Sequence, residues 1–201
     1  TLFRSGVWSK YLLPPQAELE GKVLGLIGFG HIAQALSLKS SALGMEVIAY
    51  ARTPSKKEGM GAITFTADLE TLLRKSNVIS LHLPLTPSTK NLISEKEIAL
   101  MQQGSYIINT ARGGIVDEAA VARELQKPNS KLAGVAFDVF EHEEAGRFQS
   151  PLVKCKNALL TPHVAGTTDR ALTNAATQLV KNIGAILSKA SPFVANPEVL
   201  Q

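Results

Sequence analysis

Short, almost continuously apolar segments alternate along the chain with longer stretches whose apolar residues recur at helical spacing. The apolar segments are bounded by Gly, Pro or polar residues, which is typical of strands buried on both faces of a parallel sheet. We expect strands at residues 23–27, 46–50, 77–83, 105–109, 132–137 and 158–161. We expect helices at residues 32–43, 68–75, 95–101, 118–126 and 168–189, with Asp117 as the cap of the fourth. This alternation implies right-handed crossovers, and so a single α/β domain with a doubly wound parallel sheet.

Composition supports a globular protein and excludes several classes. The 201 residues are 45% hydrophobic and 19% charged, which is unlike a disordered segment. The single cysteine, Cys155, excludes an internal disulfide framework and a zinc site built on several thiolates, and we expect it to be a small buried residue. No apolar run reaches the ~20 residues that span a bilayer, and no signal peptide opens the chain. We therefore expect a cytoplasmic protein with no membrane association and no metal site.

The net charge of +4 does not indicate a nucleic-acid partner. Proteins that bind nucleic acids usually concentrate basic residues in a stripe interleaved with aromatic residues. Here the Lys and Arg residues are spread along the chain, and aromatic residues make up only 5% of it. A mild positive charge fits an anionic small ligand equally well.

The first expected strand runs directly into the sequence GFGHIA, which opens the first long helix. Its placement between strand and helix predicts a Rossmann-type dinucleotide site. Gly28 would permit the tight turn, Gly30 would let the backbone approach a pyrophosphate, and Ala33 is small enough for helix and strand to pack. His31 and Ile32 would lie beside the pyrophosphate. The alternative is a plain strand-to-helix turn whose glycines serve only geometry.

The end of the second expected strand bears on the choice between NAD and NADP. An NAD-selective site would place an acidic residue there to bind the 2′-hydroxyl of the ribose. The sequence instead continues as ARTPSKK, so Arg52 and Thr53 stand where the acid is expected. A guanidinium and hydroxyl groups suit a 2′-phosphate. We therefore expect NADP to be preferred over NAD, with an ordinary solvated loop and a relaxed preference as the alternative.

Three polar segments each follow the carboxyl end of an expected strand. They are NTARGGIVD at residues 109–117, DVFEHE at 138–143 and TPHVAGT at 161–167. Ligands of open α/β sheets bind at this edge, so an arginine, a carboxylate and a histidine would meet beside the nicotinamide. The chain has no G-x-S-x-G motif, which argues against acyl transfer.

Taken together, these segments resemble the nucleotide-binding domain of the D-isomer-specific 2-hydroxyacid dehydrogenases. The resemblance covers nearly the whole chain and rests on ELEGKVLGLIGFGHIA, SLHLPLTPSTKNLI, LMQQGSYIINTARGGIVDEAAV, KLAGVAFDVFEHE and LLTPHVAGTT, in that order. One departure is Glu144, because the family often has proline after the catalytic glutamate. The resemblance is closest in kind to glyoxylate and hydroxypyruvate reductases.

The resemblance implies a role for each residue of the site. Arg112 would bind the substrate carboxylate, His163 would be the acid/base, and Glu143 would be the partner of His163. Without the resemblance, Glu143 could not be preferred over Glu141 or Glu144. The residues expected to contact the cofactor, besides those of the phosphate loop and the second strand, are Leu83, Pro84, Thr89, Thr110, Ala111, Arg112, Asp138, His163 and Ala165.

These residue types fit the reduction of a small 2-keto acid to a 2-hydroxy acid. A histidine can hold and release a proton near neutral pH, an adjacent glutamate stabilises its charged form, and a guanidinium can bind a carboxylate with two hydrogen bonds. The alternative from another class is a dinucleotide-sensing corepressor that retains the same three residues. A third is a naturally short protein that binds cofactor without catalysis, against which the intact triad argues.

We expect one dinucleotide-binding domain flanked by two short segments. Residues 1–20, which contain FRSGVWS, resemble a connecting arm that contributes to a homodimer in the family. Residues 21–190 would form the dinucleotide-binding domain, and residues 191–201 would return towards a substrate-binding domain that is largely absent from this chain. We therefore expect the chain alone to bind cofactor but to reduce 2-keto acids poorly. The identity of the substrate lies outside these arguments.

Overall fold

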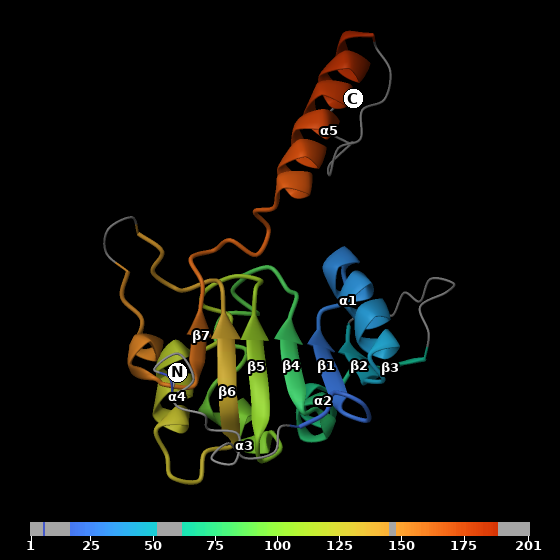
Figure 1. The fold of residues 1–201 in the computed structure, drawn as a ribbon. Coiled ribbons are helices and arrows are strands. Elements are labelled where there is room, and N and C mark those ends of the chain that lie inside the picture. Colours follow the sequence, from blue (N-terminus) through green and yellow to red (C-terminus); the bar gives the residue numbers. More distant parts are fainter. Residues whose placement is uncertain (1–5, 7–16, 52–61, 145–147, 189–201) are drawn as a thin grey trace.

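The computed structural model of the chain describes residues 6, 17–51, 62–144 and 148–188. Its strands are β1 (Val23–Ile27), β2 (Glu46–Tyr50), β3 (Ile63–Thr66), β4 (Val78–Leu81), β5 (Ser105–Asn109), β6 (Leu132–Phe137) and β7 (Ala158–Leu160). They form one parallel sheet in the order β3-β2-β1-β4-β5-β6-β7 (Figure 1). Strand order reverses between β1 and β4, so the sheet is doubly wound and the predicted fold class is confirmed.

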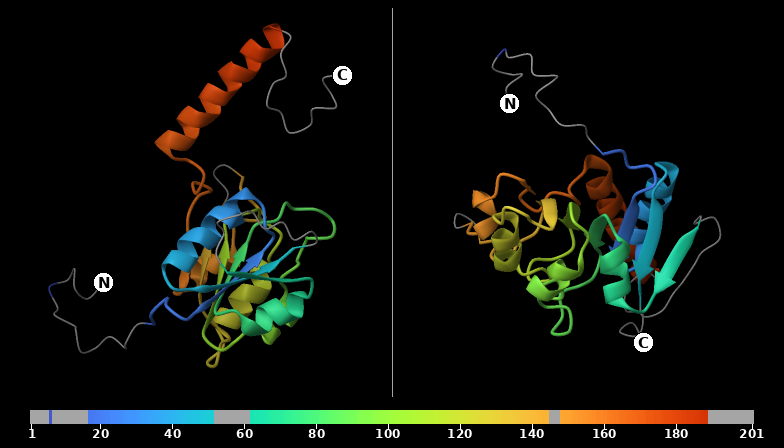
Figure 2. Two further views of the ribbon diagram at one scale, coloured as in Figure 1. Left: turned by 90° about the vertical axis from the view of Figure 1, so that its right-hand side faces the viewer. Right: turned by 90° about the horizontal axis from the view of Figure 1, so that it is seen from below.

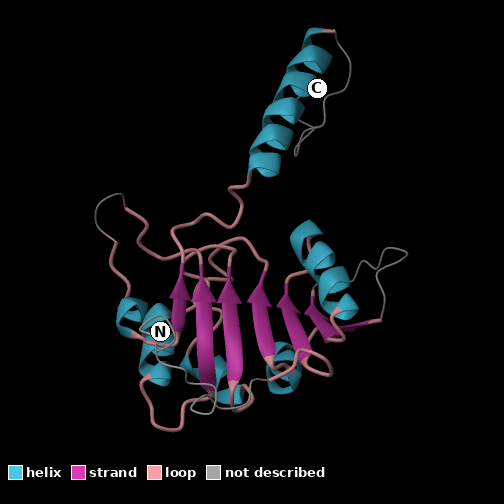
Figure 3. Cartoon of the chain, in the orientation of Figure 1, coloured by secondary structure: helices cyan, strands magenta, loops and turns pink. Residues whose placement is uncertain are grey.

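Helix α1 (His31–Ala42) packs on one face of this sheet, and α2 (Leu69–Lys75), α3 (Glu95–Leu100) and α4 (Glu118–Leu125) pack on the other (Figures 2 and 3). The remaining helix is α5 (Asp169–Leu187), and a short 3₁₀ turn lies at Pro151–Lys154. In β1, Leu24 and Leu26 pack with Ala33 of α1, whereas Ile27 belongs to a larger cluster that includes Leu73 of α2. Successive side chains of a strand point to opposite faces, which explains why an almost wholly apolar strand is needed here.

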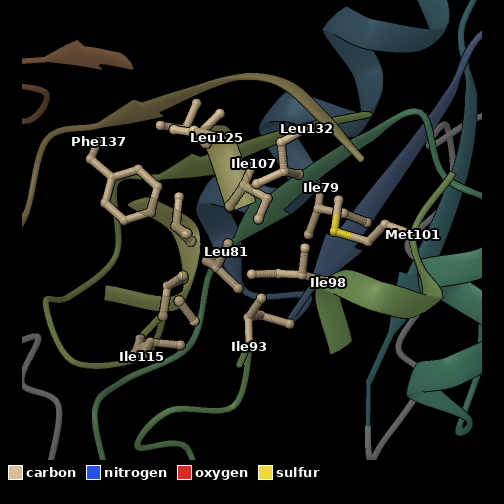
Figure 4. Packing of buried hydrophobic residues seen from close by; sticks show 14 of the residues in the cluster. Ile79, Leu81, Ile93, Ile98, Met101, Ile107, Ile115, Leu125, Leu132 and Phe137 are labelled. Atoms are coloured by element: carbon tan, nitrogen blue, oxygen red, sulfur yellow. The ribbon is translucent and has the colours of Figure 1, made fainter. Parts of the chain in front are cut away.

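The larger core cluster lies between the sheet and helices α2, α3 and α4 (Figure 4). Ile79, Leu81 and Ile107 of the central strands are fully buried in it, and Phe137 at the end of β6 is 1% exposed. Burial of each such side chain contributes about 1.5–3 kcal/mol. The strand ends that carry the polar segments are therefore held on a rigid base.

Two strand predictions were incomplete. The sequence pattern missed β3, a four-residue edge strand with sequence ITFT that pairs only with β2 and has no fully buried residue. Such a strand lacks the continuous apolar pattern of a buried one. The third expected strand, 77–83, is shorter in the structure, where β4 ends at Leu81. His82 still donates its N–H to the Ile27 carbonyl, but Pro84 has no N–H with which to continue the ladder.

The helix starts follow their capping residues. The Asp117 side chain accepts a hydrogen bond from the Ala120 N–H at 2.9 Å, which confirms the predicted cap of α4. Asp68 and Thr168 were expected as the first residues of their helices, but each is the cap instead. Their side-chain oxygens accept backbone N–H groups of the first turn, so each helix begins one residue later than predicted.

Helix α5 stands away from the sheet (Figure 1), and none of its residues is buried. Its apolar residues therefore remain exposed, for example Leu172 at 60%, Leu179 at 60% and Val180 at 69%. Among the described helices, α5 included, none combines the length and apolar character needed to cross a membrane.

Candidate active site

The turn after β1 leaves the N-terminus of α1 open. Gly28 has a φ of 93°, and a Cβ at this position would lie 2.5 Å from the His82 carbonyl oxygen. Gly30 caps α1 without a side-chain hydrogen bond, and a Cβ there would meet nothing within 4 Å. Ala33 is fully buried between α1 and β1. Uncapped N–H groups and the helix dipole attract an anion, so this turn fits a phosphate group.

Two adjoining hollows extend from this turn along the carboxyl edge of the sheet. The first, of about 360 Å³, is lined by Gly30, His31, Ile32, Ala33, His82, Leu83, Pro84, Thr110, Ala111 and Arg112. The second, of about 280 Å³, is lined by Thr110, Ala136, Phe137, Asp138, Leu159, Thr161, Val164 and Ala165. Thr110 borders both. The structure thus brings most of the residues predicted to contact the cofactor to one continuous edge.

Five residues predicted to contact the cofactor do not line these hollows. Gly28 lies in the phosphate turn itself, and His163 is paired with Glu143. The Thr89 hydroxyl donates to the Pro84 carbonyl at 2.7 Å and accepts from the Thr86 N–H at 2.8 Å, so it stabilises its own turn. Arg52 and Thr53 lie outside the described residues. Cofactor contact by these five residues stays a prediction.

The turn that carries Arg112 is held by two hydrogen bonds with the Asn109 side chain and by a close backbone approach at Gly113. The Asn109 side chain accepts from the Ala111 N–H at 3.1 Å and donates to the Arg112 carbonyl at 3.0 Å. A Cβ on Gly113 would lie 1.8 Å from the Phe140 carbonyl oxygen, so only glycine allows this close approach. The guanidinium itself is exposed, and its Nη1 donates to the Ala111 carbonyl at 2.6 Å. The turn therefore presents a cationic group at the edge of the first hollow.

His163 and Glu143 form a hydrogen-bonded pair. His163 Nδ1 lies 2.7 Å from Glu143 Oε2, and the other carboxylate oxygen accepts the Phe140 N–H at 2.8 Å. Burial alone would raise the pKa of Glu143, but the bonds from His163 and Phe140 outweigh it and hold that pKa below its usual value. Because the charged carboxylate engages Nδ1, Nε2 is the ring nitrogen left for proton exchange with a ligand. His163 has a φ of 54°, a conformation that is uncommon outside glycine.

The structure also distinguishes between the neighbouring acidic residues. Glu143 contacts His163, whereas Glu141 Oε1 lies 3.7 Å from Lys90 Nζ and belongs to a surface ion pair. His142 is exposed, and Cys155 is buried as predicted. No group of three or more possible metal ligands occurs here or elsewhere in the described part of the chain.

Asp138 holds the loop that carries His163. Its carboxylate accepts hydrogen bonds from the Thr161 hydroxyl at 2.5 Å and from the N–H groups of Val164 at 2.9 Å and Ala165 at 2.8 Å. Its side chain is buried, which by itself would raise the pKa of Asp138, but these three bonds lower the pKa below its usual value. The carboxylate is thus charged and committed to the loop; its predicted contact with the nicotinamide stays a prediction.

His82 begins the segment HLPL at residues 82–85, which the family resemblance implies lines the cofactor. In the structure it lines the first hollow, and its Nε2 lies 3.0 Å from the Ser80 hydroxyl. Burial lowers the pKa of His82 to about 4, so the ring is neutral at physiological pH. This lowered pKa is the property that the sequence did not predict.

This burial predicts a loss of stability in mild acid. Since the pKa of His82 is about 4 in the folded chain and 6.5 otherwise, the unfolded chain binds a proton that the folded chain does not. The free energy of unfolding should therefore fall by about 2 kcal/mol between pH 6.5 and pH 5. Urea titrations at both pH values should show a smaller fall for His82→Asn and an unchanged one for His142→Asn, whose side chain is exposed. An equal fall in all three proteins would contradict the assignment.

Comparison with known proteins agrees with this geometry. Residues 1–165 match the family model of the D-isomer specific 2-hydroxyacid dehydrogenase, NAD binding domain. The chain is 39% identical over 206 residues to the glyoxylate reductase of Thermococcus litoralis, covering 98% of this chain and 60% of that protein. It is 44% identical over 172 residues to the D-3-phosphoglycerate dehydrogenase of Escherichia coli, covering 84% of this chain and 41% of that protein. A solved acyclic imino acid reductase in complex with NADPH and D-Arg matches with a TM-score of 0.81 and 29% identity, over 94% of this chain and 58% of that one.

The comparisons bear on the choice between a dehydrogenase and a dinucleotide-sensing corepressor. The curated relatives named above are a reductase and a dehydrogenase, so the corepressor alternative is not favoured. The chain spans 60% or less of the length of these relatives. The chain belongs to the D-isomer-specific 2-hydroxyacid dehydrogenase family and is its NAD-binding domain.

Proposed function

We propose that the protein reduces a small 2-keto acid to a 2-hydroxy acid with NADPH or NADH. The observation that carries this proposal is the 2.7 Å pair of His163 Nδ1 and Glu143 Oε2, at the same sheet edge as Arg112 and the open N-terminus of α1. A protein that only bound dinucleotide would have no chemical need for a proton donor at this place. The uncapped turn at Gly30 fits the cofactor pyrophosphate.

In this proposal each residue has a distinct task. Bound nicotinamide would supply the hydride. The Arg112 guanidinium binds the substrate carboxylate and so orients the keto carbon. His163 donates the proton from Nε2 to the keto oxygen, while Glu143 stabilises the protonated ring through Nδ1. Asp138 keeps the His163 loop in position through its bonds to Val164 and Ala165.

The activity is tested in protein expressed from the complete reading frame that contains this chain. We expect oxidation of NADPH on addition of glyoxylate or hydroxypyruvate, and little or none with the 201-residue chain alone, because rate depends on a closed cleft around the substrate. Tight NADPH binding without turnover of any of a broad set of 2-keto acids would contradict the proposal and return attention to dinucleotide sensing.

We propose a preference for NADPH over NADH. Strand β2 ends at Tyr50, and the sequence continues with Ala51 and Arg52, so Arg52 stands where an acidic residue for the 2′-hydroxyl of NAD is expected. Arg52→Asp should weaken NADPH binding about tenfold or more and favour NADH, measured by titration with both cofactors. Arg123→Asp on α4 is the charge-matched control and should change neither affinity. Equal affinities in the unaltered chain would show the preference to be absent.

We further propose that the protein is a homodimer. The resemblance of the FRSGVWS arm motivates this, and two-fold dimers are the most frequent oligomers. A hollow of about 830 Å³ also crosses the face of β4 to β7, where Tyr106 is 46% and Leu159 is 66% exposed. Sedimentation at micromolar concentration should give twice 21.5 kDa. Tyr106→Glu should shift the equilibrium towards monomer if this face takes part, and a monomeric unaltered protein would refute the dimer.

A further inference from the structure

Glu118 is a buried acidic residue to which the proposed function gives no task. It is the first residue of α4, directly after the cap Asp117, and it is 9% exposed. A buried carboxylate loses its hydration, so hydrogen bonds must replace the lost water. Both oxygens of Glu118 accept such bonds, and neither donor belongs to α4.

The two bonds of Glu118 reach the loop that carries Glu143. Its Oε1 accepts the Glu141 N–H at 2.7 Å, and its Oε2 accepts the Ser150 hydroxyl at 2.6 Å. In the chain, Glu141 precedes Glu143 and Ser150 follows it. Glu118 therefore joins α4 to a point on either side of Glu143.

The first of these points is the peptide group between Phe140 and Glu141. Its N–H bonds Glu118, and its carbonyl lies so close to Gly113 that a Cβ there would overlap it. The preceding N–H, that of Phe140, donates to Glu143 Oε1 at 2.8 Å. A shift of this peptide group would therefore move the donor that orients the Glu143 carboxylate.

The second point is Ser150, the cap of the 3₁₀ turn. While its hydroxyl donates to Glu118, the same oxygen accepts the Leu152 N–H at 3.3 Å. Leu152 is fully buried in the larger core cluster, which also contains Val121 of α4. This bond thus ends on a residue that the core holds in place.

We propose that Glu118 is a positioning residue that acts on the reaction through Glu143. By holding the loop after β6 at two points, it keeps the Glu143 carboxylate 2.7 Å from His163 Nδ1. This inference rests on the proposed function, in which that carboxylate orients the imidazole. Glu118 lines neither hollow of the cofactor edge, but a displacement of about 1 Å at a reacting group can lower a rate about 10²-fold.

The first test measures glyoxylate reduction by variants of the protein from the complete reading frame. Glu118→Ala should lower kcat about tenfold or more while NADPH affinity changes little. Glu118→Gln keeps an oxygen for the Glu141 N–H and an amide group that can donate to the Ser150 oxygen, so it should retain most of the turnover. Equal losses in both variants would overturn the proposal.

Glu124 provides a matched control on the same helix. It is 7% exposed, its Oε1 accepts the Lys131 N–H at 2.7 Å, and its Oε2 pairs with Lys127 Nζ at 2.6 Å. Glu124→Ala should therefore lower resistance to urea about as much as Glu118→Ala does, but it should leave kcat unchanged. If both variants lose turnover in step with stability, Glu118 has only a structural role and the proposal fails.

A double variant tests the route through Glu143. If Glu118 acts only by positioning that carboxylate, adding Glu118→Ala to Glu143→Ala should lower kcat no further than Glu143→Ala alone. Losses that multiply would show that Glu118 acts independently of Glu143 and would overturn the inference.

The ring nitrogens of His163 report on the same positioning without substrate. In alkaline solution the neutral ring carries one proton, and a carboxylate at Nδ1 keeps the proton there. In nitrogen NMR spectra of the 201-residue chain, Glu118→Ala should shift this proton towards Nε2, as Glu143→Ala does, and Glu124→Ala should not. The signal that disappears in His163→Asn identifies the residue among the four histidines.

This spectrum separates the inference from the proposed function. An unchanged His163 ring in Glu118→Ala overturns the inference, whether or not the protein reduces 2-keto acids. A shifted proton in a protein that reduces no 2-keto acid supports the hold of Glu118 on Glu143 but overturns the proposed function.

Discussion

His163→Ala should lower the turnover of 2-keto acids about 10²- to 10⁴-fold in protein from the complete reading frame, the range typical of losing a positioned proton donor. Glu143 is not placed to replace the imidazole, because its Oε1 is held by the Phe140 N–H and its Oε2 faces His163. Affinity for NADPH should change little, which titration would show. A variant that retained more than about a tenth of the activity would exclude His163 as the proton donor.

Glu143→Gln is the companion to that experiment. The carboxylate oxygen 2.7 Å from Nδ1 orients the imidazole and stabilises its charged form, so its replacement should lower turnover about tenfold or more while NADPH affinity changes little. Glu141→Gln is the matched control, because that carboxylate pairs with Lys90. Equal turnover in the two variants would remove Glu143 from its assigned role.

Asp138→Ala should have the largest effect on stability among the site variants. It leaves the Thr161 hydroxyl and the N–H groups of Val164 and Ala165 without their acceptor. Because water can reach the exposed part of this loop, we expect a loss of about 2–4 kcal/mol in the free energy of unfolding rather than the full sum for three buried groups. Urea denaturation of the 201-residue chain at pH 7 measures it.

Asp138→Asn tests the contribution of the negative charge at position 138 while keeping the size of the side chain. The amide keeps an oxygen acceptor for one or two of the donors but loses the negative charge, so its stability should lie between those of the unaltered chain and Asp138→Ala. If both variants are as stable as the unaltered chain, Asp138 does not hold the His163 loop, and its role reduces to the predicted contact with the nicotinamide.

Much of the scaffold follows from local sequence. Apolar runs bounded by polar residues or glycine are strands because only a sheet covered on both faces buries them, as with Ile79 and Ile107. The phosphate turn was also readable, since Gly28 adopts a positive φ and Gly30 leaves the end of α1 open. In contrast, the sequence pattern did not predict β3. This edge strand has the sequence ITFT, which contains neither a continuous apolar run nor a buried residue.

The chemistry at the carboxyl edge required the tertiary structure. Without the family resemblance, the sequence did not distinguish Glu143 from Glu141 and Glu144. In the structure the loops after β6 and β7 meet, and Glu143 is the residue whose carboxylate reaches His163. The same applies to His82, whose pKa is lowered by a burial that the local sequence does not predict. The apolar pattern of a strand is visible in neighbouring residues. In contrast, the bonds from Glu143 to His163 and from Asp138 to the His163 loop join residues 20 to 27 positions apart, so they form only when the sheet brings its strand ends together.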